Sequence, residues 1–267
     1  MSHRTMEAHY RPNWELTQAH GLNAYNCGYA ETPGVGTFDE HQQALVWRLL
    51  GDVDIRPDST VLDVGCGIGG PIGWMAERYR PRRAIGLEYC QSSAQAAEER
   101  YRHQEHRPSF LQGDAHCLPL ADASADVIFN LESALHYANK QAFLSECRRV
   151  LRPGGTLCLG DITTRTKVMF APIQWLNLLP VQFNCNIHLW SDEDYLEAFE
   201  ANGLQVLRHE EASRSVAHAL LDGLREMARI SWLSSSGFRR RRLLLAILQH
   251  RFQAAELTYD LFAVRKS

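Results

Sequence analysis

The stretch VLDVGCGIGG at residues 61–70 constrains the fold of this chain more than any other feature. An apolar run ends at Val64, and glycines follow at positions 65, 67 and 70. This pattern is typical of a buried strand that turns sharply into a helix, and its spacing matches G-x-G-x-x-G, which cradles a pyrophosphate in dinucleotide-binding proteins. The loop alone leaves open whether it binds such a cofactor or a ligand without phosphate.

Short β-type runs alternate with helical patterns through the rest of the chain. The expected strands are TVLDV (60–64), RAIGLEY (83–89), PSFLQGD (108–114), ADVIFNLE (125–132), GTLCLGDI (155–162), LQVLRHEE (204–211) and LTYDLFAVRK (257–266). Strand–helix–strand alternation predicts an α/β fold: a doubly wound, mostly parallel seven-stranded sheet. Ligands of such sheets bind at the carboxyl ends of the strands.

Two kinds of segment stand outside this alternation. Residues 1–38 are rich in Tyr, Asn, Gly and Pro, and we expect an irregular N-terminal arm that precedes a domain over 39–267. Within that domain, insertions at about 163–190 and 213–253 interrupt the pattern. The first insertion is apolar and contains two tryptophans, which favours a lid over a hydrophobic substrate.

The composition limits the classes of partner. The chain of 267 residues has 28 basic and 31 acidic residues, a net charge of −3 that gives no reason to expect nucleic-acid binding. The run at 239–242 of four arginines is read as the solvated start of a helix. Seven cysteines without C-x-x-C spacing predict reduced thiols and no metal site. No signal peptide or membrane span is expected, so we predict a cytoplasmic protein with a small-molecule substrate, one that can form a homo-oligomer.

Three acidic residues bear on the cofactor. Asp63 lies inside the first strand, where dinucleotide binders usually carry an apolar residue, and a carboxylate there needs a polar partner. Glu88 ends the second strand and suits a ribose, which both candidate cofactors contain. Asp114 ends the third strand and can accept a hydrogen bond from an adenine amine. Because no site for a second nucleotide is apparent, the set favours a compact nucleoside.

The motifs VLDVGCGIGG, GLEY, GDAHCLPL, DVIFNLESALHY and RVLRPGG, over about residues 40–165, resemble the motif series of the seven-strand, Rossmann-like S-adenosylmethionine-dependent methyltransferases. The resemblance implies S-adenosylmethionine as cofactor. It implies that the glycine loop lies at the methionine moiety, that Asp63 reaches the cofactor's amino group through water and that Asn130 contributes backbone contacts. The cofactor-binding residues expected on this basis are Tyr25, Asp63, Gly65, Cys66, Gly67, Glu88, Tyr89, Asp114, Ala115, His116 and Asn130. For Tyr89 and His116 the alternative is ordinary packing. For the chain as a whole the alternative is a dehydrogenase that uses the same loop.

The segment LESALHY resembles the LES-x-x-H segment of methyltransferases that modify sugar hydroxyls and other natural products. This resemblance implies that His136 is the general base and that Asp161 orients it; the alternative is that both only pack or cap. The substrate pocket is expected to include Glu132, Trp175, Phe183, His188 and Trp190. We therefore predict O-methylation of a small, partly apolar metabolite of secondary metabolism. C-methylation of an isoprenoid or aromatic acceptor and a non-catalytic nucleoside-binding role remain the alternatives.

Overall fold

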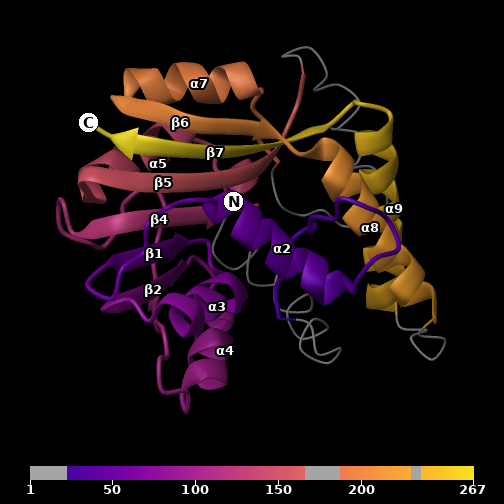
Figure 1. The fold of residues 1–267 in the computed structure, drawn as a ribbon, viewed down its shortest axis with the longest axis horizontal. Helices are drawn as coiled ribbons and strands as arrows, with labels where there is room; N and C mark the ends of the chain where they lie inside the picture. Colours follow the sequence, from indigo (N-terminus) through magenta and orange to yellow (C-terminus); the bar gives the residue numbers. More distant parts are fainter. Residues whose placement is uncertain (1–22, 166–186, 230–235) are drawn as a thin grey trace.

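Figure 1 shows the chain as a computed structural model, which describes residues 23–165, 187–229 and 236–267. The described strands form one seven-stranded sheet in the order β3-β2-β1-β4-β5-β7-β6. Neighbours are parallel from β3 to β5, and β7 runs antiparallel to both β5 and β6. The strands are β1 Thr60–Val64, β2 Arg83–Glu88, β3 Ser109–Gln112, β4 Ala125–Leu131, β5 Leu151–Thr163, β6 Leu204–Glu211 and β7 Thr258–Lys266. The prediction of a mostly parallel seven-stranded sheet is confirmed.

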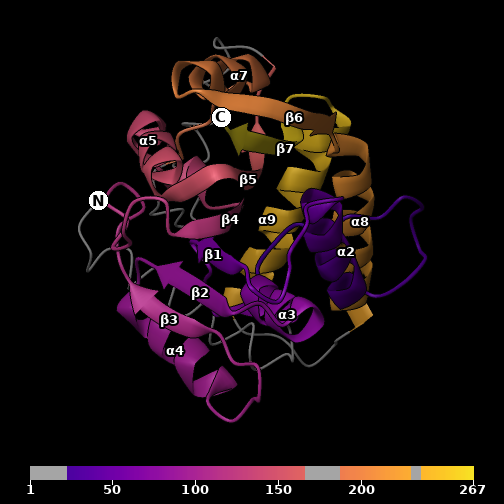
Figure 2. The same cartoon turned by 60° about the vertical axis from the view of Figure 1, so that its left-hand side comes forward.

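Helices cover both faces of the sheet, as Figure 2 shows. One apolar cluster joins the sheet to α2 Phe38–Leu50 and α3 Gly70–Tyr79, and a second joins it to α5 Lys140–Val150 and α7 Asp192–Ala201. The helix α4 Gln91–Tyr101 packs beside β2 and β3. Side-chain caps fix two helix starts: Thr37 with Glu40 at α2, and Ser191 with Asp194 at α7.

Two strand boundaries differ by more than one residue from the sequence-based expectation. The third strand ends at Gln112, before Asp114, because the chain turns there into a bridge between Asp114 and Cys117. The fifth strand begins at Leu151, ahead of the predicted start at residue 155. Leu151 pairs with Ala125 before a register shift, so the Arg-Pro-Gly-Gly turn lies inside the ladder as a bulge.

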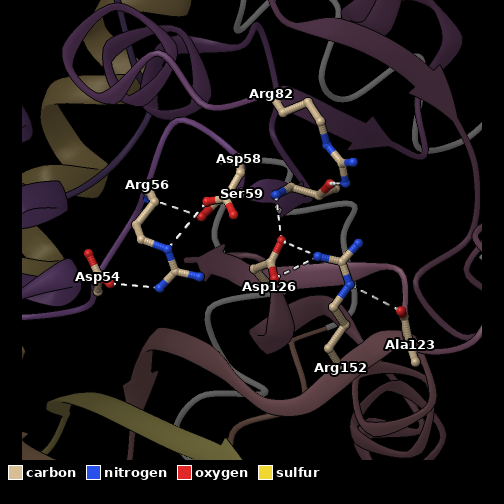
Figure 3. A network of polar contacts seen from close by, with 9 residues as sticks. Asp54, Arg56, Asp58, Ser59, Arg82, Ala123, Asp126 and Arg152 are labelled. Atoms are coloured by element: carbon tan, nitrogen blue, oxygen red, sulfur yellow. Dashed lines mark hydrogen bonds and ion pairs between the residues drawn. The ribbon is translucent and has the colours of Figure 1, made fainter.

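A polar network fastens the amino-terminal ends of the parallel strands (Figure 3). Both carboxylate oxygens of Asp126, at the start of β4, lie 2.7 Å from Nη1 of Arg152 on β5. One of these oxygens also accepts from the backbone N–H of Thr60 on β1, at 2.7 Å. Three central strands are thereby held in register at the edge opposite the glycine loop.

The helices α8 Ser213–Arg229 and α9 Ser236–Gln253 pack side by side and stand beyond the carboxyl ends of β4 and β5 (Figure 1). They occupy the second predicted insertion, residues 213–253. Most of the first insertion, with Trp175 and Phe183, lies outside the described residues. Within the described ranges, no helix has the length and apolarity needed to cross a membrane.

Candidate active site

The loop after β1 depends on two glycines for different reasons. Gly65 has φ +78°, and a Cβ built on it would lie 1.9 Å from Oγ of Ser133. Gly67 has φ +56°, but among the described residues a Cβ there would meet nothing within 4 Å. Gly65 is therefore required for close packing as well as backbone conformation, whereas Gly67 borders open space in which a ligand can approach the backbone.

Asp63 is a buried carboxyl group beneath this loop. It is 2% exposed, and within the described part of the chain its Oδ2 atom has no hydrogen-bond partner. Burial, followed by the negative charge of Glu88, raises the pKa of Asp63 to about 8, and a backbone hydrogen bond from Ile72 opposes this rise. A buried oxygen without a partner is costly, so the site has an unmet demand for a donor.

Glu88 and Asp114 lie at the carboxyl ends of neighbouring strands, as expected. The Glu88 carboxylate accepts from the backbone N–H groups of Gly67 and Cys90, both at 2.9 Å, which ties the tip of β2 to the glycine loop. Asp114 is more open and accepts from the backbone N–H of His116 at 2.9 Å. The ring nitrogen Nδ1 of His116 lies 2.6 Å from the same carboxylate oxygen.

The remaining predicted cofactor residues differ in their exposure. Cys66 and Ala115 are buried, Tyr89 is partly buried, and Tyr25 is exposed. Asn130 is fully buried, and its Nδ2 donates to the carbonyl oxygen of Val64 at 2.8 Å. The family resemblance implied backbone contacts for Asn130, and the structure adds that its side chain fixes the end of β1.

Two residues that sequence reasoning did not single out complete this corner. Oγ of Ser133 lies 2.7 Å from the hydroxyl of Tyr137, which also lies 3.3 Å from Nδ2 of Asn130. The Tyr137 ring contacts the His116 ring edge to face, with centroids 5.5 Å apart. Both residues fall within the LESALHY segment, and Ser133 is one of the fixed positions of LES-x-x-H, so this motif was the signal that could have found them.

His136 lies on a short 3-10 helix, η1 Ala134–His136, directly after β4. Asp161, fully buried on β5, accepts from the backbone N–H of Leu135 at 3.2 Å and from the Tyr195 hydroxyl at 2.6 Å. Burial raises the pKa of Asp161 to about 6, and the nearby charge of Lys140 opposes this rise. Asp161 thus holds the turn that carries His136 through the preceding residue. Its action on the imidazole itself remains a prediction.

Glu132 connects the two ends of the chain at this site. Its Oε1 accepts from the backbone N–H of Cys27 at 2.7 Å and from the Tyr259 hydroxyl at 2.9 Å. The residue has φ +50°, and burial raises the pKa of its carboxyl to about 7. A strained residue that holds a proton near neutrality is typical of a functional position.

The described residues at the end of the first insertion adjoin the same turn. The backbone N–H of His188 donates to the carbonyl oxygen of Leu135 at 2.7 Å. The Nζ of Lys140, at the start of α5, donates to the His188 carbonyl oxygen. His188 therefore lies beside the turn that carries His136, and its contact with a substrate remains a prediction.

Trp190 anchors the insertion to the sheet and to α7. It is partly buried and packs edge to face on Tyr195, with ring centroids 5.2 Å apart. Its backbone carbonyl accepts from the N–H of Thr164 at 3.1 Å, and the ammonium group of Lys140 lies 5.6 Å from its ring centroid. These contacts account for the position of Trp190, and its place in a substrate pocket also remains a prediction.

The residues at the glycine loop fit S-adenosylmethionine. Judged from the residues that the structure describes, the unpartnered oxygen of Asp63 suits an ammonium donor, and the open space at Gly67 leaves room for a ligand against the backbone. The carboxylates of Glu88 and Asp114, on successive strand ends, suit ribose hydroxyls and an adenine amine. These groups and this fold define a Rossmann-like nucleoside-binding domain.

Comparison with known proteins identifies the family. Residues 62–159 match the model of a methyltransferase domain. The chain is 30% identical over 187 residues to a fatty-acid O-methyltransferase of Mycolicibacterium smegmatis, an alignment that covers 65% of this chain and 67% of the relative. It is 35% identical over 139 residues to the erythromycin 3''-O-methyltransferase of Saccharopolyspora erythraea, with 51% of this chain covered. The alignment covers 45% of that relative, so the chain spans about half of its length.

The fold also matches solved structures over the whole chain. The mycolic acid cyclopropane synthase CmaA1, complexed with SAH and CTAB, superimposes with a TM-score of 0.83 at 21% identity, covering 100% of this chain and 99% of that one. At this identity the likeness concerns the fold alone. Together with the sequence relatives, it shows that the chain belongs to the S-adenosylmethionine-dependent methyltransferases of the seven-strand class, with S-adenosylmethionine as cofactor.

Proposed function

We propose that this protein transfers a methyl group from S-adenosylmethionine to an oxygen atom of a small, partly apolar metabolite of secondary metabolism, with His136 as general base. The observation that carries the proposal is the position of His136 on η1, directly after β4 and one residue beyond the Leu135 amide that Asp161 binds. The sequence relatives named for O-methylation of a fatty acid and of erythromycin support an oxygen acceptor of this kind.

The chain's own residues have three tasks in such a reaction: they hold the acceptor, exclude water and remove a proton. S-adenosylmethionine, when bound, supplies an electrophilic methyl group, so the protein must hold the acceptor in line with it and exclude water. The helices α8 and α9 and the segment around Trp190 would cover the acceptor, and the arm before residue 38 would cover the cofactor. His136 would remove the proton of the acceptor hydroxyl, which increases the nucleophilicity of the oxygen.

A specific observation favours a second candidate, C-methylation with Glu132 as base. The Glu132 carboxyl is buried with a pKa of about 7, and it is held by Cys27 and Tyr259 at the carboxyl end of β4. A carboxylate in such a position can stabilise a carbocation or remove its proton. This role requires no proton transfer to His136, so the two candidates differ in the residue on which turnover depends.

The substitution His136→Ala tests the proposal. We expect it to lower kcat by about 10²–10⁴-fold, the usual contribution of a general base, while the Kd of S-adenosylhomocysteine stays within about twofold of the wild-type value. Turnover is measured as release of S-adenosylhomocysteine with hydroxylated, partly apolar acceptors, and binding is measured by calorimetry. His106→Ala is the matched control, because His106 is exposed in the connection between α4 and β3, at the amino-terminal end of the sheet and away from η1.

Two outcomes would contradict the proposal. Normal turnover of the His136→Ala variant, combined with loss of turnover in Glu132→Gln, would favour C-methylation instead. Cofactor binding by the wild-type protein without turnover of any acceptor would favour a non-catalytic nucleoside-binding role.

A further inference from the structure

A chain of hydrogen bonds runs from the amide of Asn130 through the hydroxyl of Tyr137 to the hydroxyl of Ser133, and the Asn130 amide fixes its direction. The carbonyl oxygen of Val64 can only accept, so the amide nitrogen of Asn130 must face it, at 2.8 Å. The second hydrogen of this amide points to the Tyr137 hydroxyl, 3.3 Å away. Tyr137 therefore accepts from Asn130 and has its own proton to donate.

The proton of Tyr137 goes to Ser133. Within the described part of the chain, the contacts of the Tyr137 hydroxyl are Nδ2 of Asn130 and Oγ of Ser133, and only Ser133 can accept. The two oxygen atoms are 2.7 Å apart, a normal distance for O–H···O. Burial also raises the pKa of Tyr137, so its hydroxyl keeps its proton. The proton of Ser133 itself is then available for another acceptor.

The position of Ser133 indicates which acceptor this is. Its Oγ packs directly on the α-carbon of Gly65, in the place that a Cβ of residue 65 would occupy. Asp63, two residues earlier, has an oxygen atom that no described residue partners and that suits an ammonium group. The end of β1 thus has an acceptor in Asp63 and a donor in Ser133, which together match the two charged groups of an α-amino acid.

We propose that Ser133 is a cofactor-binding residue, that it donates a hydrogen bond to the methionine carboxylate of S-adenosylmethionine, and that Tyr137 is the positioning residue that directs its proton. The inference rests on the family's cofactor and not on His136 or on the identity of the acceptor.

The experiment measures binding of two probes by calorimetry. S-adenosylhomocysteine has the carboxylate, and its decarboxylated analogue lacks that group alone. For Ser133→Ala we expect the Kd of S-adenosylhomocysteine to rise about tenfold, as for the loss of a charge-assisted hydrogen bond, and the Kd of the analogue to stay within about twofold. Tyr137→Phe should have a smaller effect in the same direction, and the double variant should lose no more than Ser133→Ala, because Tyr137 acts through Ser133.

The matched control is Ser124→Ala, which removes a hydroxyl that donates to Ala121 at the opposite end of β4. It should bind both probes like the wild type. Unchanged binding of S-adenosylhomocysteine by Ser133→Ala would overturn the inference, and so would equal weakening of both probes, which would indicate a structural role. Because binding is measured without turnover, failure here is distinguishable from failure of the proposed O-methylation.

Discussion

At the scale of single residues, the carboxyl group of Asp63 suits cofactor binding but lowers the stability of the folded protein. Its pKa of about 8 lies far above the ordinary value of 3.8 because it is buried beside Glu88. The folded state therefore holds this proton more tightly than the unfolded state does. By linkage, the contribution of Asp63 to stability is greatest below its ordinary pKa and is lost as the pH rises toward 8.

The substitution Asp63→Asn removes this charge while keeping the shape of the side chain. We expect it to raise the Tm by about 3 °C or more relative to the wild type at about pH 8, and by clearly less at about pH 5. Thermal unfolding at the two pH values measures the difference. The same variant should bind S-adenosylhomocysteine more weakly, because the ligand's ammonium group stabilises the ionised form of the Asp63 carboxyl group, whereas an amide cannot ionise. A Tm shift that is equal at both pH values would contradict the pKa argument.

At the scale of elements, the chain around residues 23–37 lies against both the start of α3 and the cap formed by α8 and α9. The Asn23 carbonyl oxygen would lie 2.1 Å from a Cβ placed on Gly70. Further along, the backbone N–H of Ala30 donates to the carbonyl oxygen of Ser215 at 3.0 Å, and the backbone N–H of Gly34 donates to the Asp222 carboxylate at 2.6 Å. These bonds join the arm to α8, so displacement of one is expected to loosen the other.

Gly70→Ala tests this arrangement, because the added methyl group must displace the arm. We expect faster hydrogen exchange of the backbone amides at 24–30 and, if the arm covers the cofactor, dissociation of S-adenosylhomocysteine that is faster by about threefold or more. Gly154→Ala is the control: it places alanine at φ +78° in open space, and so strains the backbone without contact with the arm. Unaltered exchange at 24–30 in Gly70→Ala would refute the close contact.

At the scale of the whole molecule, the two ends of the sheet have different tasks. The glycine loop, η1 and the cap lie at the carboxyl ends of the parallel strands, whereas the Asp126 network lies at the amino ends (Figure 3). Residues at the amino ends are therefore expected to affect folding with little effect on binding.

Asp126→Ala should accordingly lower the free energy of unfolding by about 1–3 kcal/mol, because it leaves Arg152 and the Thr60 amide without their shared acceptor. Denaturant unfolding measures this loss, and the Kd of S-adenosylhomocysteine should not change. Asp58→Ala is the control, since its ion pair with Arg56 is largely exposed and contributes little. A large loss of cofactor affinity in Asp126→Ala would show that the two ends are coupled.

The strands and their parallel arrangement could be predicted from the sequence because each depends on local information, and the cofactor could be predicted because the motifs resemble those of a known family. Apolar runs separated by amphipathic helices define the sheet, and the position of a residue just beyond a strand places it at the binding edge. Glu88 and Asp114 were identified in this way, and Asp63 was identified as a carboxylate inside a buried strand. The exact start of β5 could not be predicted, because a register shift against β4 draws Leu151 into the ladder.

The partners of the site residues were decided by the tertiary structure alone. Glu132 meets Cys27 across 105 residues of chain and Tyr259 across 127, and no local pattern encodes such pairs. Likewise, Asp161 binds the backbone of Leu135, and Ser133 fills the space that Gly65 leaves free. The sequence by itself thus determined the fold through its periodicity, and it indicated the cofactor through the resemblance of its motifs to those of a known family. Only the packing of distant segments decided which groups meet, because burial and hydrogen-bond geometry depend on the assembled sheet.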